Sequence, residues 1–386
     1  MGPEPGSPPP TLLCVANFPA NTGFAWDFIE GLYARCADAL ASRGVRTFVA
    51  YPRIDSPPRS LVASAAQPVE LDALTERLPR LLRLMRWVRR ENVRAIYFTD
   101  RLSRSWGYAW LRLAGVRWIV VHDHTSGKRR VPRGLRRMLK RLFSLLPGVT
   151  ADHVIAVSDY VATRQREVAL MPADRVTRIW NGLPVPDPVE SRPDVRRRIG
   201  LPLDRPVIVC ACRATPEKGV HHLLRAFDQV HGSDHRAAPL LVYVGDGPHQ
   251  KELEKVRAGL ARREHVMFAG YRTDVPDYLW AADICVAPSV WEDALPLGVL
   301  EPMALGRPVI ASRVGGVPEM CRHEQEGLLV APGDEPALAA ALARLLDAPA
   351  LSERLGQQGR ARAREHFAPE SQINGLLAAL EPGLIR

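Results

Sequence analysis

Short runs of apolar residues alternate with amphipathic stretches along nearly the whole chain. The first run, residues 11–18, has the length and composition of a buried strand, and a helical pattern follows over residues 26–43. Strands that alternate with helices are typical of a parallel sheet covered by helices. The pattern predicts further helices over residues 71–91 and 220–230, and further strands over residues 46–51, 95–99, 118–122, 153–158, 207–211, 240–245, 265–269, 284–288 and 308–312.

The alternation is interrupted once, by a proline-rich segment over residues 182–192. Pro184, Pro186 and Pro188 cannot continue a helix or a central strand, so we interpret this segment as a linker. A length of 386 residues is also more than one domain usually needs. We predict a disordered tail over residues 1–10, α/β domains over residues 11–185 and 186–365, and a C-terminal helix over residues 366–386.

The charge of the chain is divided unevenly between the two predicted domains. The whole sequence has 52 Lys and Arg against 42 Asp and Glu, and residues 1–190 alone hold 28 basic and 17 acidic side chains. The second half is therefore close to neutral. A basic domain of this kind indicates an acidic partner, which can be nucleic acid, a membrane surface or an anionic substrate.

Much of the positive charge lies in one segment, residues 128–141, which holds eight basic and no acidic residues. After Pro132, apolar residues recur every three or four positions, which predicts a basic amphipathic helix. Either this helix packs its apolar face on the sheet, or it docks on anionic lipid or an anionic acceptor. No nucleic-acid reader motif accompanies the charge, so we expect no nucleic-acid partner. The residues of the predicted acceptor or membrane surface are His124, Lys128, Arg129, Arg130, Arg136, Arg137, Lys140 and Arg141.

The cysteines and the apolar runs bear on the cellular compartment. The six cysteines form no Cys-x-x-Cys pair and have no metal-ligand spacing with histidine, and most lie in apolar runs. We therefore expect a reduced, cytoplasmic protein without a bound metal. No apolar stretch approaches the roughly 20 residues of a membrane span, which leaves peripheral contact with the inner membrane face.

Two turns that follow predicted strands of the second half carry candidate anion ligands. Arg213 and Lys218 lie between the strand over residues 207–211 and the next helix, and cations beside free backbone N–H groups suit a diphosphate. Gly245-Asp246-Gly247-Pro248 follows the next strand and is by itself a weaker signal.

The segment over residues 281–320 carries the strongest candidate site. Asp293 follows a strand and Glu301 lies eight residues later in a predicted helix, where carboxylates can accept hydrogen bonds from sugar hydroxyls. Free N–H groups around Leu297 and Gly298, at the start of that helix, can bind a phosphate. Pro302 inside the helix removes a hydrogen bond and is expected to delay the helix start or to kink the helix.

The order of these motifs resembles the family 4 glycosyltransferases, which have the GT-B fold. The resemblance is specific over about residues 205–330 and loose upstream. It implies two Rossmann-like parallel-sheet domains that face a central cleft, with the nucleotide-sugar donor on the second domain and the acceptor on the first. It also implies that the C-terminal helix returns to the first domain, and that neither a cofactor nor a metal is needed.

The resemblance assigns roles to individual residues of this sequence. Arg213 and Lys218 would neutralise the donor diphosphate, Glu301 would bind the nucleotide ribose, and Asp293, where the family usually has Glu, would contact the sugar. His122, at the end of the strand over residues 118–122, would lie near the transferred sugar. The predicted catalytic residues are His122, Arg213, Lys218 and Asp293. The predicted donor-binding residues are Gly23, Gly245, Glu292, Leu297, Gly298 and Glu301.

The function predicted on these grounds is the transfer of a sugar from a UDP- or GDP-sugar to a hydroxyl acceptor, with retention of configuration. The expected setting is the biosynthesis of an envelope polysaccharide, a glycolipid or a natural product, with an anionic or lipid-linked acceptor. One alternative is an epimerase or phosphorylase of the same fold. The other is a non-catalytic membrane-binding protein on a degenerate transferase fold.

Overall fold

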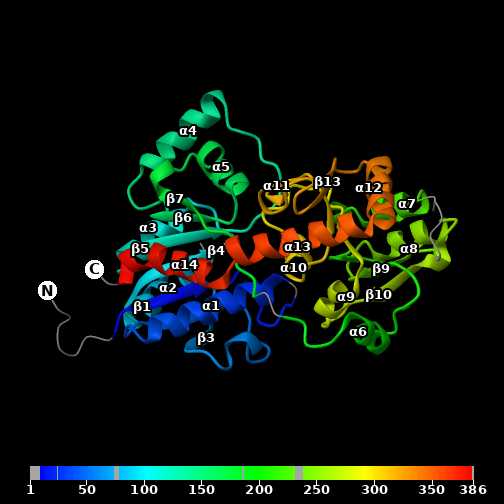
Figure 1. Cartoon of the computed structure of the whole chain (residues 1–386). Coiled ribbons are helices and arrows are strands. Elements are labelled where there is room, and N and C mark those ends of the chain that lie inside the picture. Colours follow the sequence, from blue (N-terminus) through cyan, green and yellow to red (C-terminus); the bar gives the residue numbers. More distant parts are fainter. Residues whose placement is uncertain (1–8, 24, 74–77, 185–186, 231–237, 385–386) are drawn as a thin grey trace. The chain divides into compact units, whose positions relative to one another are not determined.

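The structure, a computed structural model, describes residues 9–23, 25–73, 78–184, 187–230 and 238–384. The chain divides into two compact units, which Figure 1 shows in colours that follow the sequence. The first unit contains Met1–Thr125, Arg129–Trp180 and Glu370–Arg386. The second contains Ser126–Lys128 and Asn181–Pro369.

The first unit is built on a parallel sheet of seven strands in the order β3-β2-β1-β4-β5-β6-β7. Its strands are β1 (Thr11–Val15), β2 (Arg46–Tyr51), β3 (Ala66–Glu70), β4 (Val93–Thr99), β5 (Trp118–Asp123), β6 (His153–Ala156) and β7 (Val176–Arg178). Its helices are α1 (Ala25–Ala41), α2 (Leu78–Arg90), α3 (Trp106–Leu113), α4 (Gly134–Leu145), α5 (Asp159–Glu167) and α14 (Pro369–Leu384), with short 3₁₀ turns at Arg59–Leu61 and Ala173–Arg175.

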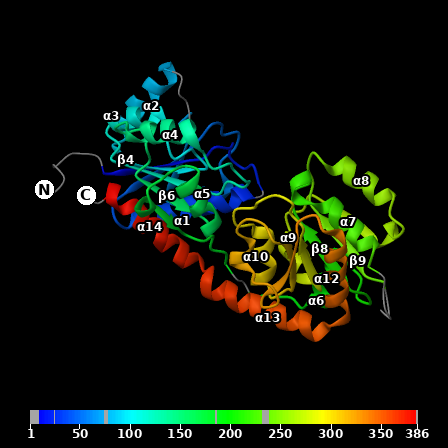
Figure 2. The ribbon, with the colours of Figure 1, turned by 90° about the horizontal axis from the view of Figure 1, so that it is seen from above.

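Helices cover both faces of this sheet, because successive side chains of a strand point to opposite sides. Leu12 and Cys14 of β1 pack in one core with the buried faces of α1 and α14. Phe48 of β2 contacts Trp87 of α2, whereas its neighbour Val49 belongs to the α1 and α14 core. The C-terminal helix α14 is thus part of the core of the first unit, as the two views in Figures 1 and 2 also show.

The second unit is built on a parallel sheet of six strands in the order β10-β9-β8-β11-β12-β13. Its strands are β8 (Val207–Ala211), β9 (Leu240–Val244), β10 (Val266–Gly270), β11 (Ile284–Ala287), β12 (Val309–Ser312) and β13 (Gly327–Val330). Its helices are α6 (Arg192–Ile199), α7 (Val220–Asp228), α8 (Gln250–Ala258), α9 (Val275–Ala281), α10 (Leu297–Ala304), α11 (Val317–Met320), α12 (Glu335–Asp347) and α13 (Pro349–His366), with 3₁₀ turns at Pro216–Lys218 and Arg263–His265.

The sheet of the second unit also has a core on each face. Ile208 and Cys210 of β8 pack with α7 and α12, and the alternate residues Val207 and Val209 pack with α6 and α9. Two parallel sheets, each with helices on both faces, confirm the predicted fold class.

Three strands escaped the sequence prediction. Two of them, β3 (AQPVE) and β7 (VTR), lie at the edges of the first sheet and carry mostly polar, partly exposed residues. The third, β13, is a four-residue edge strand of the second sheet. An edge strand needs less apolar surface than a central one, so the sequences of β3 and β7 give a weak signal. β13 (GLLV) is apolar and mostly buried, but a run of four residues is too short for its pattern to identify a strand. The predicted helix over residues 71–91 is shorter, with α2 at Leu78–Arg90, and residues 74–77 lie outside the described residues.

The strand orders fix where each unit can bind a ligand. In the first sheet the order reverses between β1 and β4, and in the second sheet it reverses between β8 and β11. Loops from neighbouring strands diverge at such a reversal, and ligands of open parallel sheets bind there, beyond the carboxyl ends of the strands.

Candidate active site

The reversal point of the second sheet gathers residues from two distant parts of the sequence. Arg213 and Lys218 follow β8, and Asp293 lies in the loop between β11 and α10. Arg213 is exposed, Lys218 is partly exposed, and Asp293 is buried. The predicted cations and the predicted carboxylate therefore share one end of one sheet.

An ion pair connects the two loops. The Nζ atom of Lys218 lies 2.8 Å from Oδ1 and 2.9 Å from Oδ2 of Asp293. The lysine side chain keeps 29% of its surface exposed, against 8% for the aspartate. The ammonium group can therefore approach a bound anion from the solvent side while it neutralises a carboxylate that burial would otherwise destabilise.

Glycines allow the loops at this point to touch through their backbones. A Cβ atom at Gly219 would lie 2.0 Å from the carbonyl oxygen of Pro288, and one at Gly315 would lie 1.9 Å from that of Asp293. Both glycines have positive φ, of 66° and 49°. A larger residue would push the loops after β8, β11 and β12 apart. The amide of Gly315 also donates a hydrogen bond to the carboxylate of Glu292, which fixes the loop that carries Asp293.

The second glycine turn has a similar structural role. Gly245 follows β9, and a Cβ atom there would lie 2.0 Å from the carbonyl oxygen of Cys212. The hydroxyl of Tyr243 donates to the same oxygen at 3.0 Å. Gly245 thus packs the turn after β9 against the residue that precedes Arg213.

Helix α10 supplies the other predicted donor-binding groups. It begins at Leu297, so Pro302 does not delay the helix start, and its N-cap Pro296 makes no side-chain capping bond. The first amides of a helix have no intrahelical partner, which leaves those of Leu297 and Gly298 suited to an anion. Burial raises the pKa of Glu301 to about 7, so this carboxyl is easily kept neutral and hydrogen-bonding.

The loop after β1 in the first unit carries the predicted Gly23. Its φ of 80° lies in the left-handed region, and its carbonyl accepts a hydrogen bond from the amide of Trp26 at the start of α1. Gly23 therefore shapes the entry to the helix. Its donor-binding role stays a prediction.

His122 lies in the interior of the first unit. Its side chain is fully buried, and Nδ1 lies 2.5 Å from the hydroxyl of Tyr97 on β4. Burial, and then the adjacent His124, lower the pKa of His122 well below its ordinary value, so the ring is neutral. His122 lies near the carboxyl end of β5, and its catalytic role stays a prediction. His124 is less enclosed, and burial lowers its pKa to about 4.

Between the two histidines lies a buried ion pair that the sequence did not indicate. Arg164 of α5 places Nη2 at 3.0 Å and 2.9 Å from the two carboxylate oxygens of Asp123, and Gln165 donates to the same group at 2.6 Å. Burial alone would raise the pKa of Asp123, but Arg164 holds it below the ordinary value. The pair fixes the loop after β5 against α5, about 40 residues later in the sequence.

The predicted basic amphipathic helix exists as α4, and its apolar face is exposed. Leu135 keeps 64% of its surface accessible and Leu139 keeps 54%, and Met138, Leu142 and Leu146 are similarly exposed. Of the two alternatives that the sequence left open, packing of this face on the sheet is therefore wrong. Most of the predicted basic residues of the segment are also exposed, while Arg137 and Lys140 are partly buried.

Apolar exposure continues onto α3. Trp106, Trp110 and Leu113 keep 57%, 43% and 67% of their surfaces accessible, and the ring of Trp106 contacts that of Phe143 on α4. Large apolar side chains that gather on neighbouring helices mark an interaction surface rather than chance exposure. We call these residues of α3 and α4 the α3–α4 surface.

The part of the chain that the structure describes brings no three His, Cys, Asp or Glu side chains together as a metal ion would require. Nor is any helix in the described ranges long and apolar enough to cross a membrane. All six cysteines are free, and the Sγ atoms of Cys210 and Cys212 lie 3.9 Å apart.

Comparison with known proteins extends the picture from the site to the whole chain. The sequence model described as Glycosyltransferase Family 4 matches residues 31–185, and the one described as Glycosyl transferases group 1 matches residues 205–348. A structure of HepE from Anabaena in complex with UDP-glucose has a TM-score of 0.74 and 20% identity, over 96% of this chain and 100% of that one.

Two curated relatives lie closer in sequence. The GDP-mannose-dependent alpha-(1-6)-phosphatidylinositol monomannoside mannosyltransferase of Mycolicibacterium smegmatis is 31% identical over 301 residues, which cover 74% of this chain and 75% of the relative. The lipopolysaccharide core biosynthesis glycosyltransferase LpsD of Rhizobium meliloti is 35% identical over 196 residues. That match covers 50% of this chain and 54%, about half, of the relative.

Two doubly wound parallel sheets, together with the likeness to HepE, show the GT-B fold. The family matches cover most of both units, and the mannosyltransferase aligns over three quarters of its length. The chain belongs to the family 4 glycosyltransferases.

Proposed function

We propose that this protein transfers a sugar from a nucleoside diphosphate donor to a hydroxyl acceptor with retention of configuration. The observation that carries the proposal is the meeting of Lys218 and Asp293 at the reversal point of the second sheet. This arrangement places a partly exposed cation beside a buried carboxylate, where a diphosphate and the sugar attached to it both need partners. The UDP-glucose complex of HepE, a protein of the same fold, supports a nucleotide-sugar donor.

The proposed transfer requires that the negative charge on the departing diphosphate be stabilised. Arg213 and Lys218 would hold that charge together with the first amides of α10, as preorganised groups do at sites of developing charge. Because two cations supply the positive charge, we expect the reaction to proceed without a metal ion. Asp293 would contact the sugar, and Glu301 the ribose, whose hydroxyls can donate to a carboxylate.

The donor proposal is tested with purified protein and a panel of labelled UDP- and GDP-sugars. We expect binding of at least one donor and slow hydrolysis of its sugar without acceptor, equally in the presence of EDTA. Failure of every donor to bind would contradict the proposal, and loss of hydrolysis in EDTA would contradict its metal-free form. An epimerase would convert the sugar without release of nucleoside diphosphate, but the relatives are named as transferases and do not favour that alternative.

For the acceptor, we propose an anionic or lipid-linked molecule at the cytoplasmic face of a membrane. The α3–α4 surface supports this, because exposed Trp and Leu side chains flanked by arginines suit the interface of an anionic bilayer. The mannosyltransferase relative is named for a phosphatidylinositol glycoside, and LpsD for the lipopolysaccharide core. Flotation with vesicles tests the proposal: binding should need anionic lipid and weaken in salt, and failure to float would contradict it.

A further inference from the structure

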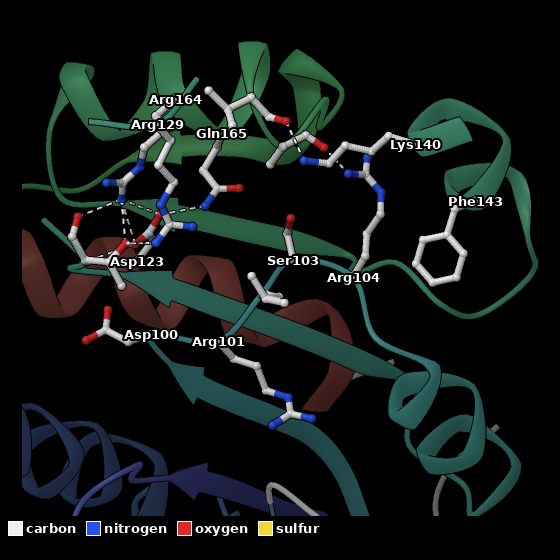
Figure 3. A pocket seen from close by; sticks show the side chains of 14 residues that line it. Asp100, Arg101, Ser103, Arg104, Asp123, Arg129, Lys140, Phe143, Arg164 and Gln165 are labelled. Carbon is white, nitrogen blue, oxygen red and sulfur yellow. Dashed lines mark hydrogen bonds and ion pairs between the residues drawn. The ribbon is translucent and has the colours of Figure 1, made fainter. Parts of the chain in front are cut away.

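A cavity of about 260 Å³ opens in the first unit beyond the carboxyl ends of β4 and β5, walled by α4 and α5 (Figure 3). Figure 3 shows Arg129, Arg164 and Gln165 near Asp123 at one end and Arg104 with Lys140 at the other, with Ser103 between them. The cavity lies at the acceptor half of the protein, and its lining is rich in cations. The charged groups that matter for its chemistry are Arg104, Arg129, Lys140, Arg164, Asp100 and Asp123.

The two carboxylates of the lining neutralise these cations only in part, since Asp100 interacts electrostatically with Arg164 and Arg129 but not with Arg104 or Lys140. Asp123 is already bound by Arg164 and Gln165. Asp100 accepts a hydrogen bond from the amide of His124 at 2.7 Å, and burial raises its pKa to about 7, so it is only partly ionised at neutral pH. The positive charge of the remaining cations is therefore left to another partner.

Those remaining cations bind neutral oxygens. Nη2 of Arg104 donates to the carbonyl of Leu170 at 2.8 Å, and Nζ of Lys140 donates to that of Val168 at 2.6 Å, both just beyond the end of α5. Arg129 reaches the hydroxyl of Thr125 at 3.4 Å. A helix end attracts cations, but carbonyl oxygens cancel only part of a full charge.

Burial makes this arrangement costly without an anion. Arg104 keeps only 8% of its surface exposed, and its Nε–H is a buried donor with no hydrogen-bond partner in the described part of the chain. Burial, and then Arg104 and Arg129, lower the pKa of Lys140, which means that both arginines repel its ammonium group. A bound anion would relieve both the repulsion and the unsatisfied donor.

We propose that this cavity binds a phosphate ester of the acceptor, with Arg104, Arg129 and Lys140 as its ligands. Cations from three separate segments line the cavity, which suits the several oxygens of a phosphate. A carboxylate is matched by one arginine, as Asp123 is by Arg164. The inference rests on the proposed function, in which the first unit holds the acceptor, and it narrows the acceptor class to phosphate-bearing compounds.

The size and the surroundings of the cavity fit such a ligand. A volume of about 260 Å³ equals that of roughly nine liquid water molecules, enough for a phosphate with a glycerol or a sugar ring. Lys140 and Phe143 line the cavity from one side of α4, while Leu135, Leu139 and Leu142 on the same helix are exposed. A lipid surface held by those leucines would place headgroup phosphates beside the cavity.

The test uses the full-length protein and glycerol 3-phosphate as the probe, followed by calorimetric titration. The wild type should bind the probe, and Arg129→Gln/Lys140→Gln should weaken binding by roughly 100-fold, since each of the two charge-assisted hydrogen bonds contributes about tenfold. The matched control is Arg136→Gln/Arg141→Gln, which removes the same charge from exposed positions of the same segment that do not line the cavity. The control should bind the probe like the wild type.

Two further arms make the outcome specific. Vesicles of phosphatidylcholine with phosphatidic acid should displace the probe if the ligand is a lipid headgroup, whereas failure to displace it would assign a soluble phosphate ester. Loss of donor binding by the wild type, with glycerol 3-phosphate still bound, would speak against the proposed function alone. Equal affinity of the wild type and this variant for glycerol 3-phosphate, or no binding by the wild type, would overturn the phosphate site.

Discussion

Lys218 is the residue on which the donor site depends most. Its ammonium group neutralises the buried carboxylate of Asp293, and in the proposed reaction it also meets the donor diphosphate. These two tasks predict different consequences of its removal. Loss of the ion pair with Asp293 affects folding, and loss of the contact with the diphosphate affects turnover.

We expect Lys218→Ala to abolish donor hydrolysis and to lower the free energy of unfolding by about 1–3 kcal/mol, since it leaves Asp293 buried without its cationic partner. Adding Asp293→Asn should restore much of the stability but not the hydrolysis. Denaturant unfolding and hydrolysis rates measure the two effects, with Lys251→Ala on the exposed side of α8 as control. Wild-type turnover in Lys218→Ala would refute its diphosphate role.

Glu301 predicts a pH dependence whose sign follows from its raised pKa. The carboxyl of Glu301 has a pKa of about 7 in the folded protein and its ordinary value of 4.5 in the unfolded chain. The free energy of unfolding therefore falls as the pH rises through that interval. Glu301→Gln removes this loss. Relative to the wild type, the variant should be equally stable at pH 4 and more stable by roughly 3 kcal/mol at pH 8.

Thermal unfolding at the two pH values checks the prediction, with the exposed Glu254→Gln as a control that should not change with pH. Donor affinity should fall in Glu301→Gln if this carboxylate binds the ribose. A stability difference that is the same at both pH values would show that burial does not govern the ionisation of Glu301.

At the scale of single elements, the structure explains why some were predicted from sequence and others were not. Central strands such as β8 are buried on both faces and read as continuous apolar runs, whereas β3 at the edge is mostly polar. Periodicity also identified α4 as amphipathic. Periodicity could not show which face of α4 is exposed to solvent, because that depends on which other elements pack against the helix.

The exposed face of α4 leads to a prediction for membrane binding. Leu139→Ser/Leu142→Ser should reduce vesicle flotation at least several-fold, because each buried leucine contributes about 1.5–3 kcal/mol to insertion. Both side chains are exposed, so stability should change by no more than about 0.5 kcal/mol. Unchanged flotation of this variant would exclude the α3–α4 surface as the membrane contact.

The packing of α14 gives a second prediction at this scale. A Cβ atom at Gly383 would lie 2.2 Å from the Cβ atom of Trp118 on β5, whose indole donates to the carbonyl of Ala379. Gly383→Ala should therefore destabilise the protein by about 1–3 kcal/mol, although alanine favours a helix. Gly31→Ala in α1, where no atom lies within 4 Å of the added Cβ, should instead stabilise by up to about 1 kcal/mol. Thermal unfolding of both variants measures these changes, and a Gly383→Ala variant as stable as the wild type would contradict the predicted clash with Trp118.

At the scale of the whole molecule, the sequence predicted the donor half of the site far better than the acceptor half. Arg213, Lys218, Asp293 and Glu301 lie in short motifs that follow strands, so the spacing along the chain already places them at one sheet end. The cavity of the first unit is assembled from side chains scattered between positions 100 and 169. No local pattern marks such a set, and the excess of basic residues was its only signal.

That excess now has specific locations. The first half of the chain holds the surplus of Lys and Arg, and the structure divides it between the exposed surface of α4 and the cavity that Lys140 and Arg104 line. The second half, close to neutral, has Arg213 and Lys218 at the reversal point of its sheet. The distribution agrees with a neutral balance around the donor and an anionic acceptor.

The most direct test of the account is a calorimetric titration of the full-length protein with UDP- and GDP-sugars. We predict saturable binding of at least one donor at one site per chain, weakened about tenfold or more by Arg213→Gln and unaffected by Arg129→Gln in the first unit. The account would be contradicted if no donor bound, or if Arg213→Gln bound the donor as tightly as the wild type.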